Sequence, residues 1–522
     1  MSWSEEDKSG VVITADSTHS LYRISPALLE EQREIAARIA AGQTERRRYH
    51  ISTFGCQQNE HDSEHMAGHL ELMGLSPADG VESADLVILN TCAVRENAAQ
   101  RFLGHLGALK PLLRNNPRLI VGVGGCLAMQ PDIREQIRRS FNFVRLIFSP
   151  NDIWRLPELF EPYLLEKSTA RRYDPEERDT LAEQQPTVRG QRFRALCSIM
   201  TGCNNFCSYC IVPFARGRER SRHPESIMRE IRDIAARGIP EVMLLGQNVN
   251  SWGHDLRKEG IIASTKSFAD LIAAVASVSG IERVRFMTSH PKDISDELIS
   301  VIAQHKNIER HIHLPLQSGS DKILRAMNRR YTAERYMEIV RVAREQIPDL
   351  ALTTDIIVGF PGETEDDFAE TLRIVREVRF SAAFMFMFSP RPGTAAADLP
   401  PVEPEVVAER FNRLLELQNS ITLEESERLL GGEYRVIVEG VSGRESGMLM
   451  GRMSDNHLVH FSVPDAVWAN YAGEAGRLPA VEDLGVQLTG RIVTVRPYEA
   501  RIFSLTGEAV EIERNDGGRT SE

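Results

Sequence analysis

Short apolar runs alternate with longer stretches of helical periodicity in the first third of the chain. The apolar runs predict buried strands at residues 49–56, 85–92 and 118–126. Helix-like stretches follow them at residues 63–73, at residues 96–113 and after Pro131. Strands that alternate with helices are typical of a parallel sheet covered by helices. The pattern therefore predicts an N-terminal parallel α/β domain over residues 46–165.

The same alternation resumes after a charged, proline-containing stretch at residues 166–192, which we interpret as a linker. Six further strands are predicted at residues 194–200, 241–247, 283–289, 311–317, 351–359 and 381–389. Helical stretches lie between them, for example at residues 224–237 and 364–378, and a long helix is predicted at 404–430. Six strand–helix units are too few for an eight-fold barrel. We therefore expect an open (β/α)6 partial barrel over residues 193–430.

The pattern changes to short β runs after Gly431 and Gly432. These runs, at residues 434–438, 448–452, 457–463 and 485–505, predict a small β-barrel over residues 431–507. Residues 1–45 form an N-terminal extension with one helix-like stretch at 26–41, and residues 508–522 form a polar tail that we expect to be disordered.

Composition narrows the class of protein. A chain of 522 residues is too long for one core, so about three domains are expected. No apolar run approaches the ~20 residues of a membrane span, and the N-terminus lacks the pattern of a signal peptide. An odd number of cysteines, 7, in such a chain indicates a reducing cytoplasm and a metal or redox role. The net charge of −12 does not by itself indicate a nucleic-acid binder.

Three cysteines are clustered just after the first strand of the predicted barrel. Cys203, Cys207 and Cys210 are separated by three and then two residues, on the loop that leaves this strand. Thiolates at such spacing bind a soft metal, either zinc or an iron–sulfur cluster. Three ligands are one short of a closed structural zinc site, but they suit a 4Fe–4S cluster with one open iron. A zinc knuckle missing a ligand, or three buried thiols, is the alternative. Cys197, inside the strand, is interpreted as a buried thiol.

A second set of cysteines stands at the ends of the three N-terminal strands. Cys56, Cys92 and Cys126 each close one predicted strand. Because ligands bind outside the carboxyl ends of the strands in an open parallel sheet, these three thiols should converge on one crevice. The alternative is that they are ordinary buried cysteines. The placement predicts a second three-thiolate site.

The cysteine loop, with Tyr209 just before its last cysteine, resembles that of the radical S-adenosylmethionine (radical SAM) enzymes. With both triads, the chain from about residue 47 to 505 resembles the methylthiotransferase family of these enzymes. The resemblance implies a SAM-binding 4Fe–4S cluster on Cys203, Cys207 and Cys210, and an auxiliary 4Fe–4S cluster on Cys56, Cys92 and Cys126. It also implies that SAM is both methyl donor and radical source, and that the C-terminal barrel is a TRAM-like RNA-binding domain. This segment carries 7 Arg or Lys against 9 Asp or Glu, so its RNA role rests on the resemblance.

Four segments resemble the branch of the family that acts on isopentenylated adenosine in tRNA. They are residues 246–250, 287–291, 313–321 and 388–394. The resemblance implies conversion of N6-isopentenyladenosine at position 37, next to the anticodon, to its 2-methylthio derivative. Threonylcarbamoyl-adenosine in tRNA or a ribosomal protein is the alternative target, and a non-enzymatic iron–sulfur RNA-binding protein is the alternative from another class.

The ends of the barrel strands supply candidate SAM contacts, because glycine lets the backbone approach a ligand closely. The candidates are Tyr209, Gly246, Gln247, Ser289, Gln317, Asp355 and Gly359. Ordinary turns between strand and helix are the alternative for the glycines. Arg216 and the arginines after it are expected to meet the SAM carboxylate or tRNA phosphates. The resemblance implies a tRNA anticodon stem-loop, an electron donor such as flavodoxin, and a sulfur or cluster supplier as partners of a cytoplasmic monomer.

Overall fold

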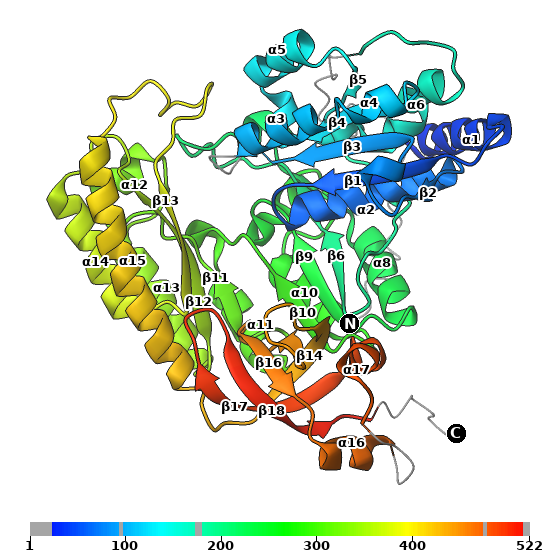
Figure 1. Cartoon of the computed structure of the whole chain (residues 1–522). Helices are drawn as coiled ribbons and strands as arrows, with labels where there is room; N and C mark the ends of the chain where they lie inside the picture. The colour runs from blue at the N-terminus through cyan, green and yellow to red at the C-terminus, as the bar shows by residue number, and fades with distance from the viewer. Residues whose placement is uncertain (1–22, 93–97, 173–179, 473–477, 515–522) are drawn as a thin grey trace.

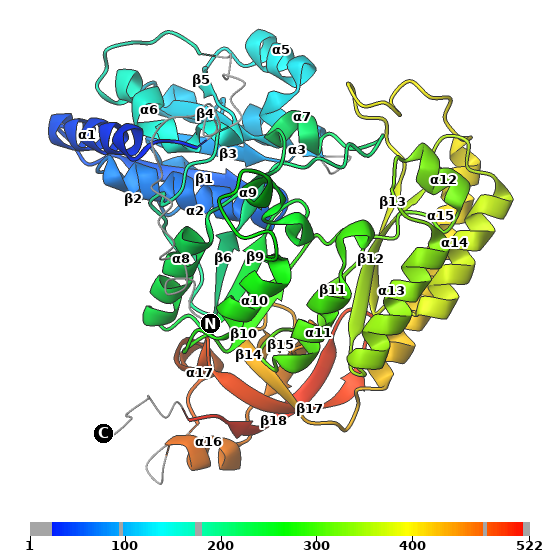
Figure 2. The same cartoon turned by 180° about the vertical axis from the view of Figure 1, so that it is seen from behind.

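The computed structural model describes residues 23–92, 98–172, 180–472 and 478–514. Three bodies follow one another from top to bottom in Figures 1 and 2: an N-terminal α/β domain, a partial barrel and a small C-terminal β-barrel. The predicted α/β fold with a closing β-barrel is confirmed. Among these residues, no helix combines the length and the apolar character that a membrane crossing requires.

The N-terminal domain is built on a parallel sheet with the strand order β2-β1-β3-β4-β5. Its strands are β1 (Arg48–Thr53), β2 (Ser76–Pro77), β3 (Leu86–Thr91), β4 (Ile120–Gly125) and β5 (Val144–Ile147). Its helices are α2 (Gln57–Leu72), α3 (Ala98–Ala108), α4 (Leu112–Asn115), α5 (Pro131–Ser140) and α6 (Leu156–Leu164). Strands β3 and β4 are buried along their whole length, as expected for a parallel sheet that is covered on both faces.

Helix α1 (Pro26–Gly42) is part of this domain rather than a separate extension. Ile35 and Ile39 are buried in the same apolar cluster as Phe160 and Leu164 of α6. The expectation that the domain begins only at residue 46 is therefore wrong for α1. The apolar positions of this helix need a partner, and the α/β domain supplies one in this cluster.

The barrel consists of two three-stranded parallel sheets, β10-β9-β6 and β11-β12-β13. Their strands are β6 (Arg194–Ser198), β9 (Glu241–Leu245), β10 (Arg283–Phe286), β11 (His311–His313), β12 (Ala351–Val358) and β13 (Ala382–Met387). A parallel bridge between Val284 and Ile308 joins the two sheets. In the described residues, β6 and β13 pair with no partner on their outer sides, which leaves the barrel open as predicted.

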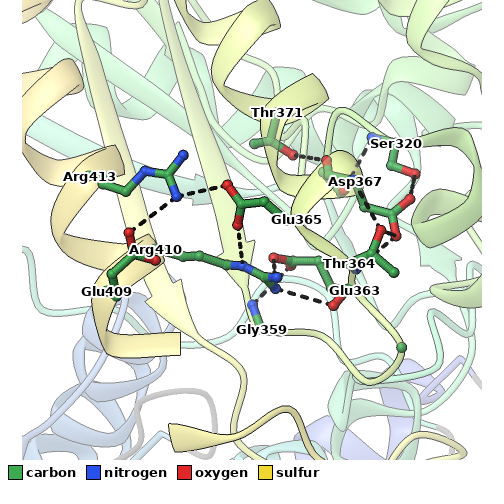
Figure 3. A network of polar contacts seen from close by, with 12 residues as sticks. Ser320, Gly359, Glu363, Thr364, Glu365, Asp367, Thr371, Glu409, Arg410 and Arg413 are labelled. Carbon is green, nitrogen blue, oxygen red and sulfur yellow. Dashed lines mark hydrogen bonds and ion pairs between the residues drawn. The ribbon is translucent and has the colours of Figure 1, made fainter. Parts of the chain in front are cut away.

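Helices follow the barrel strands, most of them on the outside, while the short α9 lies at the end of the barrel that faces the N-terminal domain (Figures 1 and 2). They are α8 (Pro224–Ala236), α9 (His254–Lys258), α10 (Phe268–Ala276), α11 (Asp296–Gln304), α12 (Asp321–Ala326), α13 (Ala333–Gln346), α14 (Glu365–Val378) and α15 (Pro404–Glu427). Figure 3 shows how α14 and α15 are fixed to the end of β12. Glu363 accepts hydrogen bonds from the Gly359 amide at 2.9 Å and from Arg410 of α15 at 3.1 Å. Asp367 accepts hydrogen bonds from Thr364 and Ser320. Thr364 is the N-cap of α14, and its pairing with Asp367 caps this helix.

The C-terminal barrel closes in the order β14-β15-β16-β18-β17. Its strands are β14 (Tyr434–Val441), β15 (Leu449–Arg452), β16 (Leu458–Ser462), β17 (Ile492–Ala500) and β18 (Leu505–Ile512), and its helices are α16 (Asp465–Ala472) and α17 (Val481–Leu488). The expectation of a polar tail from residue 508 is wrong for residues 508–512, which belong to β18. Glu508 and Glu511 make this stretch look polar, but they are exposed while Ala509 and Ile512 are buried in the barrel.

Candidate functional site

The strand-end triad, Cys56, Cys92 and Cys126, lies at the carboxyl ends of β1, β3 and β4. The arrows of β1 and β3 point to this edge of the sheet, on the left of the N-terminal domain in Figure 1. Cys56 is the first residue before α2, Cys92 follows β3, and Cys126 opens the single 3-10 turn after β4. A hydrogen bond with Cys92 lowers the pKa of Cys56 to about 6. Burial raises the pKa of Cys126, and the neighbouring charge of Cys56 acts on it in the same direction. The fold therefore brings these cysteines, far apart in sequence, into one neighbourhood.

Two asparagines next to the strand-end triad, Asn59 and Asn90, are hydrogen-bonded to each other. Asn90, two residues before Cys92, donates from Nδ2 to the Asn59 carbonyl at 2.8 Å, and Asn59 donates to Asn90 Oδ1 at 3.3 Å. Both side chains are fully buried. The pair fixes the start of α2 to the end of β3, and so positions Cys56 relative to Cys92. The sequence reasoning missed it, although an asparagine inside an otherwise apolar strand was a usable signal.

A glycine before Cys126 permits the close approach of β3 and β4. Gly125 has φ +93°, and a Cβ there would lie 2.2 Å from the Thr91 carbonyl oxygen and 2.5 Å from the Thr91 nitrogen. We expect Gly125→Ala to destabilise the domain by about 3 kcal/mol through backbone strain and overpacking. Thermal unfolding and iron retention of the variant measure the effect.

Gly104→Ala is the matched control, because a Cβ on this exposed residue of α3 meets no atom within 4 Å. This change should leave stability unaltered or raise it by up to about 1 kcal/mol. Equal melting temperatures for the Gly125→Ala and Gly104→Ala variants would contradict the prediction.

The loop triad, Cys203, Cys207 and Cys210, lies between β7 (Met200–Thr201) and β8 (Arg220–Ser221). These two strands form a short antiparallel pair at the exit of β6. The Cys203 amide donates to the Gly217 carbonyl at 3.1 Å, and the Cys210 amide donates to the Cys207 carbonyl at 2.9 Å. Burial raises the pKa of Cys203 to about 11 and that of Cys210 to about 12, and in both cases the charge of Cys207 adds to the shift. These thiols therefore stay protonated unless a metal takes them as thiolates.

Cys197 lies within β6, and its side chain is fully buried. Burial raises the pKa of its thiol to about 12. The prediction of a buried structural thiol is confirmed.

The two triads face the same domain interface. Cys126 packs against Ile211, the residue after Cys210, and against Ala215 of α7 (Val212–Arg216). Each set offers three sulfur donors, the ligand chemistry of an iron–sulfur cluster. Within the described part of the chain, no group of three or more His, Cys, Asp or Glu side chains is placed to hold a single metal ion, so no site for a lone ion is assigned.

Several predicted SAM contacts carry buried polar atoms that have no hydrogen-bond partner among the residues that the structure describes. They are Gln247 Oε1 after β9, Ser289 Oγ after β10 and Gln317 Oε1 after β11. Thr288 and Gln317 adopt φ of 66° and 65°, which is strained backbone for residues other than glycine. Because buried polar atoms are nearly always hydrogen-bonded, these strand ends fit a polar ligand such as SAM.

The other predicted contacts have protein neighbours. Tyr209 packs beside Met327, Phe360 and Phe388, while Asp355 Oδ2 lies 3.5 Å from His313 Nε2. A Cβ on Gly246 would lie 2.6 Å from Met200 Cγ, and one on Gly359 would lie 2.4 Å from Val407 Cγ2 of α15. Their roles toward SAM stay predictions.

Two arginines of the cluster after the cysteine loop are buried, which corrects the expectation that they meet phosphates or the SAM carboxylate. Arg216 pairs with Asp62 of α2 at 2.6 Å, and Arg222 pairs with Glu230 of α8 at 2.7 Å. Each of the two is less than a tenth exposed. Sequence reasoning also missed Arg329, whose Nη1 donates to Cys207 Sγ at 3.5 Å.

Two family models match the parts of the chain that carry the two triads. The pattern of the Radical SAM superfamily matches residues 197–375, which include the loop triad, and that of the Uncharacterized protein family UPF0004 matches residues 48–149, which include the strand-end triad. A radical S-adenosylmethionine methyltransferase, TsrM, from Kitasatospora setae aligns with 76% of this chain and 79% of its own, at a TM-score of 0.47 and 15% identity.

Relatives at much higher identity extend over nearly the whole chain. The tRNA-2-methylthio-N(6)-dimethylallyladenosine synthase of Thermoanaerobacter pseudethanolicus is 44% identical over 89% of this chain and 93% of its own. The protein of the same name from Acetivibrio thermocellus is 42% identical over 98% of this chain and 100% of its own. The resemblance to the methylthiotransferases is thereby confirmed, and the chain belongs to the tRNA-2-methylthio-N(6)-dimethylallyladenosine synthase family of radical SAM enzymes.

Proposed function

We propose that this chain converts N6-isopentenyladenosine at position 37 of tRNA to its 2-methylthio derivative, with the work divided between the two triads. Cys203, Cys207 and Cys210 hold the SAM-binding 4Fe–4S cluster, and Cys56, Cys92 and Cys126 hold the auxiliary one. When bound, the clusters supply the electron that cleaves SAM and the site that carries sulfur. The observation that carries the proposal is the contact of Cys126 with Ile211, because it sets both triads against one interface.

The residues of the barrel would bind and orient SAM. Three polar atoms without a partner among the described residues, on Gln247, Ser289 and Gln317, lie at the carboxyl ends of three strands, where ligands of parallel α/β folds bind. Acid–base groups do not readily break the C2–H bond of adenine, so the site must also keep water away from the radical that breaks it.

Exposed aromatic rings and arginine beside the cysteine loop support an RNA substrate. Phe206 and Phe214 are exposed, with ring centroids 6.3 Å apart, and the Arg218 guanidinium lies 5.3 Å from the Phe206 ring. Next to them is a pocket of about 530 Å³ in which cations outnumber carboxylates. Its charged lining consists of Arg218, Arg220, Lys258, Lys292 and Arg330 together with Glu219, Asp255 and Glu259. Aromatic rings stack on splayed bases and cations neutralise phosphates, so this surface suits an anticodon loop whose adenosine is turned outward.

We expect Arg218→Ala to weaken tRNA binding and to reduce the salt dependence of the binding constant by the equivalent of about one phosphate contact. Binding titrations at several salt concentrations measure both. Arg232→Ala, on the exposed side of α8, is the control and should change neither. Unchanged affinity and salt slope for Arg218→Ala would count against this surface as the tRNA site.

The proposal includes the partners that the chemistry needs. An electron donor such as flavodoxin must reduce the SAM-binding cluster, and a sulfur or cluster supplier must restore the sulfur lost in each product. We also propose that the protein acts as a cytoplasmic monomer and that its C-terminal TRAM-like barrel contributes to RNA binding.

The test is mass spectrometry of tRNA nucleosides from cells that lack this chain. These tRNAs should retain isopentenyladenosine and lack its 2-methylthio derivative, and the intact gene should restore it. Anaerobically reconstituted protein should hold about eight irons, as two 4Fe–4S clusters require. A normal methylthio nucleoside level in the deleted cells, or a change confined to threonylcarbamoyl-adenosine or to a ribosomal protein, would overturn the proposed substrate.

A further inference from the structure

A buried arginine of the barrel domain reaches across the interface to the N-terminal triad. Arg216 is the last residue of α7, and its Nε donates a hydrogen bond to Cys126 Sγ at 3.1 Å. Its Nη2 donates to Asp62 Oδ2 of α2 at 2.6 Å. The backbone of Arg216 therefore belongs to the domain of the loop triad, whereas its guanidinium is bound to the other domain.

The guanidinium is held firmly in this position. Arg216 is 4% exposed and Asp62 is 6% exposed, so the ion pair is shielded from solvent. Burial opposes the charged form, but the charges of Asp62 and Cys126 outweigh it and raise the pKa of Arg216. Because the Asp62 carboxylate holds Nη2 of the planar guanidinium, the Nε–H of Arg216 points in a defined direction, toward Cys126 Sγ.

The loop triad offers a contact for comparison. Arg329 Nη1 donates to Cys207 Sγ at 3.5 Å, and Arg329 is also buried. Arg329 comes from the same domain as the sulfur that it contacts, whereas Arg216 comes from the opposite one. The auxiliary site thus acquires its sulfur hydrogen bond from Arg216 only when the two domains are docked.

Such a contact has a known electrostatic consequence. Thiolates and the cluster they hold concentrate negative charge, and a nearby positive charge or a hydrogen bond to sulfur favours the reduced state. Groups that orient metal ligands also affect metal retention and activity, typically by 10- to 100-fold.

We propose that Arg216 is a positioning residue for the auxiliary cluster. It orients Cys126, raises the reduction potential of the cluster and ties the sulfur site to the domain that binds SAM. This inference rests on the proposed function, which assigns the auxiliary cluster to Cys126.

The test uses a background in which Cys203, Cys207 and Cys210 are all alanine, so that the auxiliary cluster is present alone, with about four irons per chain. In this background Arg216→Gln should make the reduction potential, followed by electron paramagnetic resonance, more negative. Arg216→Lys keeps the charge without the Nε donor and should restore part of the shift. Arg232→Gln, an exposed arginine of α8, should leave the potential unchanged. With all cysteines present, Arg216→Gln should lower product formation by about tenfold.

Arg216→Gln leaves Asp62 buried without its charge partner, which endangers folding. The double change Arg216→Gln with Asp62→Asn removes both charges of the pair. Because loss of the carboxylate opposes loss of the guanidinium, the potential should shift in the same direction but by less, at an unchanged melting temperature. A full complement of about four irons with an unchanged potential in the double variant overturns the role of Arg216. If the chain that lacks Cys203, Cys207 and Cys210 but keeps Arg216 binds no iron, the assignment of the auxiliary cluster is wrong, and the proposal falls with it.

Discussion

Replacing Cys92 by alanine should abolish the methylthio product while SAM cleavage continues. Cys92 stands at the end of β3 in the N-terminal domain, and its thiol is hydrogen-bonded with Cys56. The change removes a proposed ligand of the auxiliary cluster but leaves Gln247, Ser289 and Gln317 at the barrel strand ends untouched. The variant should therefore still form 5′-deoxyadenosine and bind tRNA. Chromatography of SAM products and mass spectrometry of tRNA nucleosides, from one anaerobic reaction, measure both outcomes.

Cys207→Ala should abolish both products, since this thiol belongs to the loop that follows β6 and is one of the proposed ligands of the SAM-binding cluster. Cys197→Ala is the matched control: its thiol is fully buried within β6, and both activities should persist. If the Cys92→Ala variant still made methylthiolated adenosine, the strand-end triad would not be the sulfur site, and the division of labour between the triads would be wrong.

The sequence predicted the elements that carry the cysteines because local patterns determine them. The apolar runs of β3 and β4 are buried along their length, and each ends immediately before a cysteine. Cys56 is the exception: β1 ends at Thr53, and the predicted strand ran three residues further, to the N-cap of α2. The error is small because a strand exit and a helix start both place the thiol at the same edge of the sheet.

Contacts between segments that are distant along the chain could not be predicted from the sequence. Arg216 and Arg222 belong to a run of alternating arginines that is typical of a solvated or phosphate-binding face. Both are buried by partners that only the folded chain supplies, and the partner of Arg216, Asp62, lies 154 positions away. The packing of the predicted helix α1 onto the α/β domain, and the residues of β18 beyond 507, were missed for the same reason, since their burial depends on surfaces elsewhere in the chain.

The C-terminal barrel is fixed to the partial barrel through a buried charge network. Arg285 of β10 contacts Glu241 of β9 at 2.9 Å and Glu309 at 2.6 Å, and these three residues are at most 3% exposed. Arg285 Nη2 also donates to the Met453 carbonyl at 3.0 Å, and Nη1 donates to Asn456 at 2.9 Å. The same guanidinium therefore ties two strands of one domain to the β15–β16 connection of the other.

Arg285→Ala should be among the most destabilising single changes in the chain. It leaves the buried carboxylates of Glu241 and Glu309 short of a cation, and such a broken pair costs about 3–5 kcal/mol. Calorimetry should show a lower unfolding temperature for the barrel domain, and limited proteolysis should release the C-terminal barrel. Arg341→Ala is the control, because its pairs with Glu338 and Glu345 on α13 are exposed and should contribute nothing measurable. If Arg285→Ala melted like Arg341→Ala, the network would not be what holds the two barrels together.

Truncation at residue 431 would also destabilise the partial barrel, because it removes the carbonyls of Met453 and Arg452. These carbonyls accept hydrogen bonds from Arg285 and Arg283. The RNA role of the C-terminal barrel is therefore better tested by substitutions on its exposed surface, such as Phe503→Ala, than by its deletion.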